Sequence, residues 1–176
     1  MTDSDAPIWR GDGFEADTWR RFAPDAEPVA DDAPLLVPAS LLLADEPDLF
    51  LNRGGPLAVE LQPGESVHPL APYLPRLDLI ALVFPKFSDG RNFSAARLLR
   101  ERYAYAGELR ATGDVLQDQI PLMRRCGIVS FEVRHAPTRA ALLAGRLPEM
   151  HHFYQPISTA AEIPAGTRPW LRQRAG

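Results

Sequence analysis

A short polar run after one apolar segment is where this sequence favours binding chemistry. The run covers residues 84–92, FPKFSDGRN, and leads into a helix expected from Phe93. The free backbone N–H groups and the positive dipole at the start of that helix favour an anion. Lys86 and Arg91 bring positive charge to the same place. The run therefore predicts a site for a small anion.

A second polar group, Thr112-Gly113-Asp114, follows the next apolar segment. Asp114 has two interpretations of equal standing: it caps the following helix, or it is a carboxylate at the end of a strand. Asp89-Gly90 fits ordinary turn chemistry better than ligand binding. The sequence assigns no catalytic residue. The candidate ligand-binding residues are Lys86, Ser88, Asp89, Arg91, Arg110, Asp114 and Gln119.

For two of these candidates, Lys86 and Arg110, the sequence also allows an interpretation without ligand binding. Lys86 is the only lysine in a chain with many arginines. It is either a chance survivor on a solvated loop or a compact ammonium kept for a specific anion or catalytic contact. Arg110 and Glu132 carry opposite charges within expected strands, so they are also predicted to form a structural ion pair.

Metal and redox chemistry have little support. The single cysteine, Cys126, excludes an intrachain disulfide, and its place at a helix C-terminus favours a buried structural thiol. The sequence has no dinucleotide fingerprint, P-loop, nucleophile elbow or iron–sulfur cysteine set, so no cofactor is predicted. No metal site is predicted either, because the histidines are isolated or directly adjacent, at His68, His135, His151 and His152.

Parallel strands joined by helices must position these residues. Short apolar runs separated by helical segments predict an α/β fold of about four consecutive parallel βα units. The expected strands are 57–62, 79–84, 108–112 and 129–133. The expected helices are 38–51, 93–103, 118–126 and 137–144, and a proline-rich crossover covers 65–74. Asn92 or Ser94 is expected to cap the second helix, Asp118 to cap the third, and Gly127 to end it.

Four units are too few for an eight-fold barrel. The alternatives are an open doubly wound sheet and a half-barrel that completes itself as a homodimer. In both, ligands are expected at the C-terminal edge of the strands.

The chain of 176 residues is expected to form a single domain. Its parts are an N-terminal hairpin and extended arm (1–33), a βα core (57–145) and a C-terminal tail (146–176). Residues 1–50 carry twelve acids and three arginines, whereas the remainder carries sixteen bases and eleven acids. This split indicates either a solvated acidic arm or a basic face for an anion or acidic partner. Nucleic-acid and membrane partners are not expected, and the cytoplasm is the expected compartment.

Residues 84–119 and 124–127 resemble the core of a bacterial family called domain of unknown function nine-three-four. The resemblance extends more weakly to Trp19-Arg20, to Gly54-Gly55-Pro56 and to Tyr154-Gln155. The family usually has a glycine at position 92 and Phe-Asp at positions 128 and 129, where this chain has Asn92, Ile128 and Val129. Genes of the family lie beside those of the sulfite reductase hemoprotein. The resemblance therefore implies a process, assimilatory sulfur metabolism, rather than a reaction.

Two hypotheses follow from the residues and the resemblance. In the first, the chain is an accessory protein that docks on the sulfite reductase hemoprotein and supports its assembly or electron delivery. In the second, it is an enzyme or binder for a small anion at the C-terminal edge of the sheet.

Overall fold

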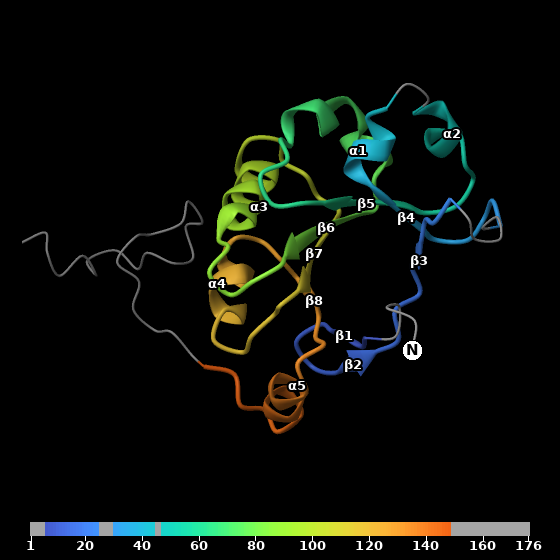
Figure 1. Ribbon diagram of the computed structural model, residues 1–176. Coiled ribbons are helices and arrows are strands. Elements are labelled where there is room, and N and C mark those ends of the chain that lie inside the picture. The colour runs from blue at the N-terminus through green and yellow to red at the C-terminus, as the bar shows by residue number, and fades with distance from the viewer. Residues whose placement is uncertain (1–5, 25–29, 45–46, 149–176) are drawn as a thin grey trace, which may run out of the picture.

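The computed structural model describes residues 6–24, 30–44 and 47–148 (Figure 1). The strands are β1 (Ile8–Trp9), β2 (Phe14–Glu15), β3 (Arg20–Arg21), β4 (Leu35–Pro38), β5 (Leu57–Leu61), β6 (Leu79–Phe84), β7 (Glu108–Gly113) and β8 (Ser130–Glu132). The α-helices are α1 (Ala39–Leu42), α2 (Asp48–Leu51), α3 (Arg91–Glu101), α4 (Ile120–Arg125) and α5 (Ala136–Leu143), and a 3-10 helix spans His68–Arg76. Residues 151, 152, 154 and 155, and all but the start of the tail, lie outside the described residues.

The strands form one sheet in the order β2-β1-β8-β7-β6-β5-β4-β3. Strands β3 to β8 are parallel, whereas β1 pairs antiparallel with both β8 and β2. The four predicted parallel strands are confirmed as β5 to β8, although β8 is shorter than expected. The predicted N-terminal hairpin is confirmed as β1 and β2.

The sheet is curled, and chain connectivity requires the curl. The two edge strands, β2 and β3, follow one another in sequence, and only residues 16–19 lie between them. The five steps from Glu15 to Arg20 can span about 18 Å, whereas the edges of a flat eight-stranded sheet lie about 34 Å apart. The sheet therefore bends into a half-barrel, with residues 16–19 as a strap across its open side. Completion of this half-barrel by a second copy stays a prediction.

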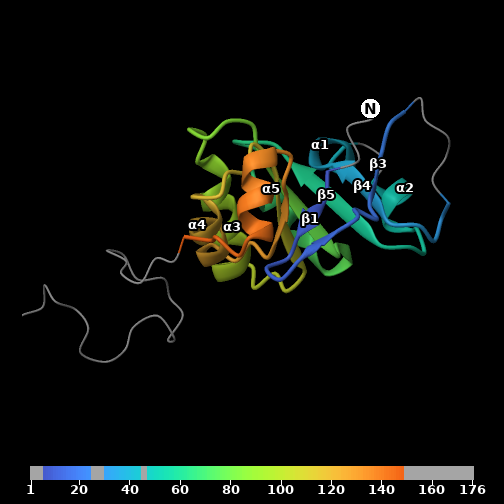
Figure 2. The same cartoon turned by 90° about the horizontal axis from the view of Figure 1, so that it is seen from below.

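The main core lies between the convex side of the sheet and the helices (Figures 1 and 2). Alternate strand residues, such as Val59, Leu82 and Leu109, point to this side and are fully buried among helix residues such as Leu99. A smaller cluster lies on the concave side, where Leu36, Ala58, Leu79 and Ala81 pack against Trp19 of the strap. Helices thus cover one face of the sheet, and the strap crosses the other.

Helix boundaries differ from the expected ones for local reasons. Residues 38–51 form two short helices, because Pro47 lacks an N–H group and its ring cannot follow a continuous helical turn. No side chain caps α3, so the expected cap at Asn92 or Ser94 is wrong; the Asn92 amide donates to the carbonyls of Leu61 and Val83 instead. No side chain caps α4, so the expected cap at Asp118 is wrong, but Gly127 ends that helix as predicted, with φ of 90°.

The expected proline-rich crossover is the 3-10 helix, and the last predicted helix is α5. In the described part of the chain, no helix has the length and apolar character needed to cross a bilayer.

Candidate functional site

The C-terminal ends of β6 and β7 are held together by a glycine. Gly113 ends β7 with φ of 93°, and a Cβ there would lie 2.4 Å from the carbonyl oxygen of Phe84. Only glycine allows this close approach, which lets the Asp114 N–H donate to the Phe84 oxygen at 2.6 Å. The loops after the two strands, 85–90 and 114–119, therefore start from one fixed point.

Two predicted site residues clamp the first of these loops by its backbone. The Asp114 carboxylate accepts a hydrogen bond from the Phe87 N–H at 3.1 Å. The buried Gln119 side chain donates to the Phe87 carbonyl, also at 3.1 Å. Asp114 and Gln119 thus lie at the predicted edge, but their polar atoms are directed at protein backbone. They position the loop.

Asp89 of the same loop forms a pair with Arg91, the first residue of α3. Nε of Arg91 donates to one oxygen of Asp89 at 3.0 Å, and Nη2 donates to the other at 2.6 Å. The side-chain hydrogen bonds from Arg91 lower the pKa of Asp89. The guanidinium also lies over Gly64, where a Cβ would be 3.0 Å from Nη1. Arg91 is therefore paired with Asp89, although its side chain is 63% exposed.

Lys86 and Ser88 differ from these neighbours. Both are exposed, and among the described residues neither side chain forms a hydrogen bond or an ion pair. Five of the seven predicted ligand-binding residues thus lie on two adjoining loops at the C-terminal edge, and a sixth, Arg91, is the first residue of α3. A pocket that joins Lys86, Arg91 and Asp114 stays a prediction.

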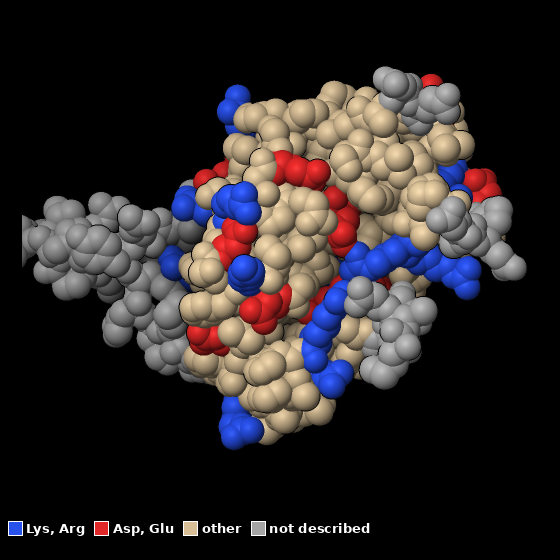
Figure 3. Space-filling model, in the orientation of Figure 1, with Lys and Arg blue, Asp and Glu red and all other residues tan. Residues whose placement is uncertain are grey.

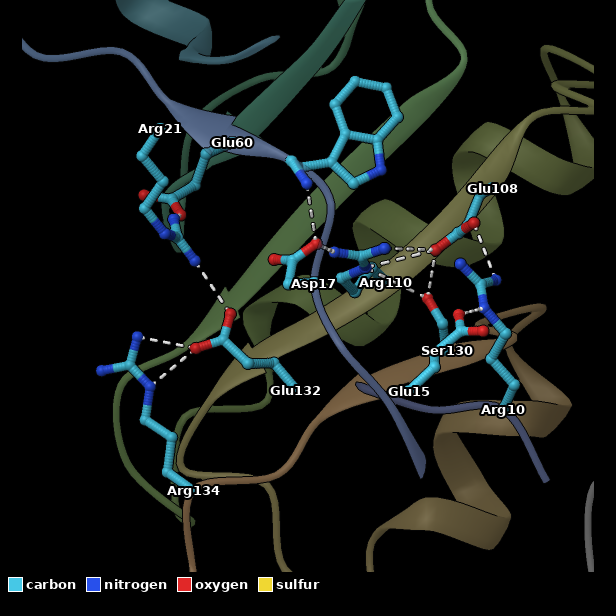
Figure 4. Close-up of polar contacts among 11 residues, drawn as sticks. Arg10, Glu15, Asp17, Arg21, Glu60, Glu108, Arg110, Ser130, Glu132 and Arg134 are labelled. Carbon is cyan, nitrogen blue, oxygen red and sulfur yellow. Dashed lines mark hydrogen bonds and ion pairs between the residues drawn. The ribbon is translucent and has the colours of Figure 1, made fainter. Parts of the chain in front are cut away.

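The seventh residue, Arg110, lies elsewhere, on the concave face. Its side chain is 3% exposed and contacts Asp17 of the strap at 2.8 Å and Glu108 at 3.0 Å (Figure 4). The predicted ion pair with Glu132 is wrong. In the parallel register Arg110 lies opposite Ser130, so Glu132 is one side-chain row further along the sheet.

Glu132 belongs to a second group on the concave face. Arg21 of β3 contacts both Glu132, at 2.8 Å, and Glu60 of β5 (Figure 4). Strands β5 and β8 are three places apart, which is about 14 Å in a flat sheet. One guanidinium reaches both carboxylates because the sheet is curled. Burial lowers the pKa of Arg21, but the two carboxylates outweigh this effect and raise it overall.

Glu108 connects the Arg110 group to the hairpin. It accepts hydrogen bonds from Arg10 at 2.8 Å and from Ser130 at 2.5 Å. Burial alone raises the pKa of Glu108, but these hydrogen bonds and the charge of Arg110 lower it overall. A carboxylate held ionised in this way is a weak proton acceptor. We call these linked polar side chains of the concave face the concave network; they are Arg10, Asp17, Arg21, Glu60, Glu108, Arg110, Ser130 and Glu132. The concave network is therefore suited to holding the strap rather than to acid–base catalysis.

This arrangement predicts how Glu108→Gln changes the pH dependence of stability. A depressed folded pKa contributes stability above the unfolded value of about 4.3, which is lost as pH falls through the folded pKa. The variant should be less stable than the wild type at pH 7, and the difference should shrink in acid. Urea unfolding at pH 7 and at progressively lower pH measures the difference. A difference that stays constant with pH would contradict the assignment.

A signal for the concave network is present in the sequence. Parallel strands covered on both faces read as continuous apolar runs. In β7 and β8, however, polar residues alternate with apolar ones, at Glu108, Arg110 and Thr112, and again at Ser130 and Glu132. This alternation indicates one polar face. Asp17 of the strap and Arg21 of β3 have no comparable local signal.

Cys126 is buried, as expected of a structural thiol. Burial is the largest influence on its pKa and raises it. We expect Cys126 to react with dithionitrobenzoate far more slowly in the native protein than in denaturant, because thiolate and access are both limited. Equal rates in the two states would contradict this.

In the described part of the chain, no group of three or more His, Cys, Asp and Glu side chains could hold a metal ion.

Residues 58–164 match the profile of a family described as bacterial proteins of unknown function, DUF934. The chain belongs to the DUF934 family. This confirms the family expected from the sequence. No curated protein matches the chain.

The DUF934 match starts in β5, so it contains both loops at the C-terminal edge and five residues of the concave network, Glu60, Glu108, Arg110, Ser130 and Glu132. The strap, with Asp17, and β3, with Arg21, lie outside it. The edge loops therefore lie entirely in the DUF934 segment. The concave network, in contrast, joins that segment to the N-terminal residues.

Proposed function

We propose that this chain is a non-catalytic accessory protein of assimilatory sulfite reduction, and that it docks on the sulfite reductase hemoprotein in the cytoplasm. The observation that carries the non-catalytic part is the internal pairing on the concave face. There, Arg21 and Arg110 each bind carboxylates from two parts of the chain. Figure 3 shows acidic and basic side chains interleaved across this side of the molecule.

Support for the sulfur assignment comes from sequence. Residues 84–119 and 124–127 resemble proteins whose genes lie beside those of the hemoprotein, and the chain belongs to the DUF934 family. An accessory protein needs a presented surface rather than a set of reactive groups. The exposed residues of the 85–90 loop supply such a surface.

Deletion of the gene tests the role. In a host that carries the gene beside its sulfite reductase, the deletion strain should grow poorly on sulfate or sulfite and normally on cysteine. Sulfite reductase activity in its extracts should fall, and a plasmid copy should restore it. Normal growth on sulfate together with unchanged activity would remove the sulfur assignment.

A second candidate, a small-anion binder or enzyme, is favoured by one observation. Lys86 is exposed at the sheet edge where such ligands bind, and among the described residues it has no ionic partner. Titration calorimetry with sulfite and with phosphate tests this candidate. Saturable binding that Lys86→Met abolishes would support it, and absence of heat with both anions would exclude it for these ligands.

A further inference from the structure

Some polar groups of the loop 85–90 hold the loop in shape, whereas other side chains of the loop face solvent. The backbone of Phe87 is clamped on both polar atoms by Asp114 and Gln119. The Asp89 N–H donates to the Lys86 carbonyl at 3.0 Å, which closes a turn. The groups left over are the Lys86 ammonium, the Phe87 ring and the Ser88 hydroxyl, which we call the 86–88 tip.

The outward position of the Phe87 ring is unusual because an aromatic cluster lies beside it in the chain. Phe84 and Phe93 flank the loop, and their rings pack edge to face at 5.1 Å. Phe84 is fully buried, whereas Phe87 is 54% exposed. The clamps on its backbone fix Phe87 in this exposed position. What distinguishes Phe87 from other exposed apolar side chains is that its backbone is held on both polar atoms and that a cation, Lys86, lies next to it; a rigidly presented aromatic ring of this kind suits a protein–protein contact.

The charges at the 86–88 tip indicate the chemistry of that partner. Asp89 is neutralised by Arg91, and the Asp114 carboxylate is directed into the loop. Arg91 is exposed too but is paired with Asp89, whereas Lys86 has no carboxylate partner among the described residues. An acidic surface would complement it, and an apolar pocket would bury the neighbouring ring. Because the loop is already fixed, little conformational entropy is lost when it binds.

We propose that the 86–88 tip is a docking element that inserts Phe87 into an apolar pocket of a partner protein, while Lys86 pairs with an acidic group at the pocket rim. This inference rests on the proposed accessory function and names the residues through which docking occurs.

The single lysine permits a direct test. A carbodiimide activates carboxyl groups, which then form an amide with a nearby amine, and Lys86 carries the only ε-amine of this chain. The purified full chain and purified hemoprotein are mixed, treated with carbodiimide and analysed by mass spectrometry. We expect an amide between Lys86 and an Asp or Glu of the hemoprotein. Lys86→Arg, which keeps the charge but lacks the reactive amine, should lose this product and bind within about twofold of wild type.

Affinity provides the second measurement. Phe87→Ala should weaken binding by about tenfold or more, as expected of an aromatic anchor. Leu143→Ala is the matched control, because Leu143 is a similarly exposed apolar residue on α5; its affinity should be unchanged. Binding that neither Phe87→Ala nor Lys86→Met weakens would overturn the docking element while leaving the accessory function intact.

A photoreactive benzoyl-phenylalanine at position 87, used in living cells, separates the two proposals. A covalent product with the hemoprotein supports both. A product with a different protein, joined through an acidic segment and dependent on Lys86, keeps the docking element and overturns the sulfite reductase partner. Absence of any product from position 87 overturns the docking element.

Discussion

Replacement of Arg110 by methionine is expected to lower the free energy of unfolding by roughly 3 to 5 kcal/mol. The Arg110 side chain is almost completely buried and contacts Asp17 and Glu108, which are themselves largely buried. Methionine fills a similar volume but leaves Asp17 without its cation and leaves Glu108 paired with Arg10 alone. The loss should be largest near neutral pH and smaller in acid, where Glu108, whose pKa is lowered in the folded protein, becomes protonated and no longer needs a cation. Urea unfolding followed by circular dichroism measures it.

Arg97→Met is the matched control for that experiment. Arg97 also pairs with a carboxylate, Glu101, but on the surface of α3, where both side chains are more than 40% exposed. An exposed pair at this helical spacing contributes about 0.3 to 0.5 kcal/mol. If Arg110→Met lowered the free energy of unfolding no more than Arg97→Met does, the concave network would contribute no more to stability than an exposed ion pair, and the prediction would be wrong. The double variant Asp17→Asn/Arg110→Met should be more stable than Arg110→Met alone, because it no longer has the unpaired Asp17 carboxylate that Arg110→Met leaves behind.

The parallel strands and their edge were predictable because they depend on local patterns. Each of β5 to β8 is a short run followed by a helical segment, and chain order then places all C-terminal ends at one edge. The position of the 85–90 loop beside Asp114 could therefore be predicted from the sequence. It could not show that Asp114 and Gln119 bind the backbone of Phe87, since that depends on the detailed conformation of the two loops.

The concave network was not predictable from local patterns. Asp17 is 93 positions from Arg110, and Arg21 is 111 positions from Glu132. Their pairing depends on the curl of the sheet, which follows only once β2 and β3 are known to be its edges. The Arg110–Glu132 prediction failed for a different reason: it matched charges without the strand register.

The largest effect on the candidate site is expected from Gly113→Ala. A methyl group at this position meets the Phe84 carbonyl oxygen at 2.4 Å, and the residue must also keep φ of 93°, which side-chain-bearing residues rarely adopt. We expect a loss of about 3 kcal/mol in stability from strain of this kind. The strands must separate to relieve the clash, which removes the hydrogen bond from the Asp114 N–H to the Phe84 oxygen.

The consequence of Gly113→Ala for the 86–88 tip distinguishes it from a general destabilisation. Displacement of Asp114 releases the Phe87 N–H, so amide hydrogen exchange at Phe87 should accelerate at temperatures where the protein remains folded. Gly13→Ala is the control, because a Cβ at Gly13 meets nothing within 4 Å and the residue lacks a positive φ; it should leave stability and Phe87 exchange near wild type. Unchanged exchange at Phe87 in Gly113→Ala would show that the loop holds its shape without the Asp114 clamp, and the fixed presentation of Phe87 would then need another cause.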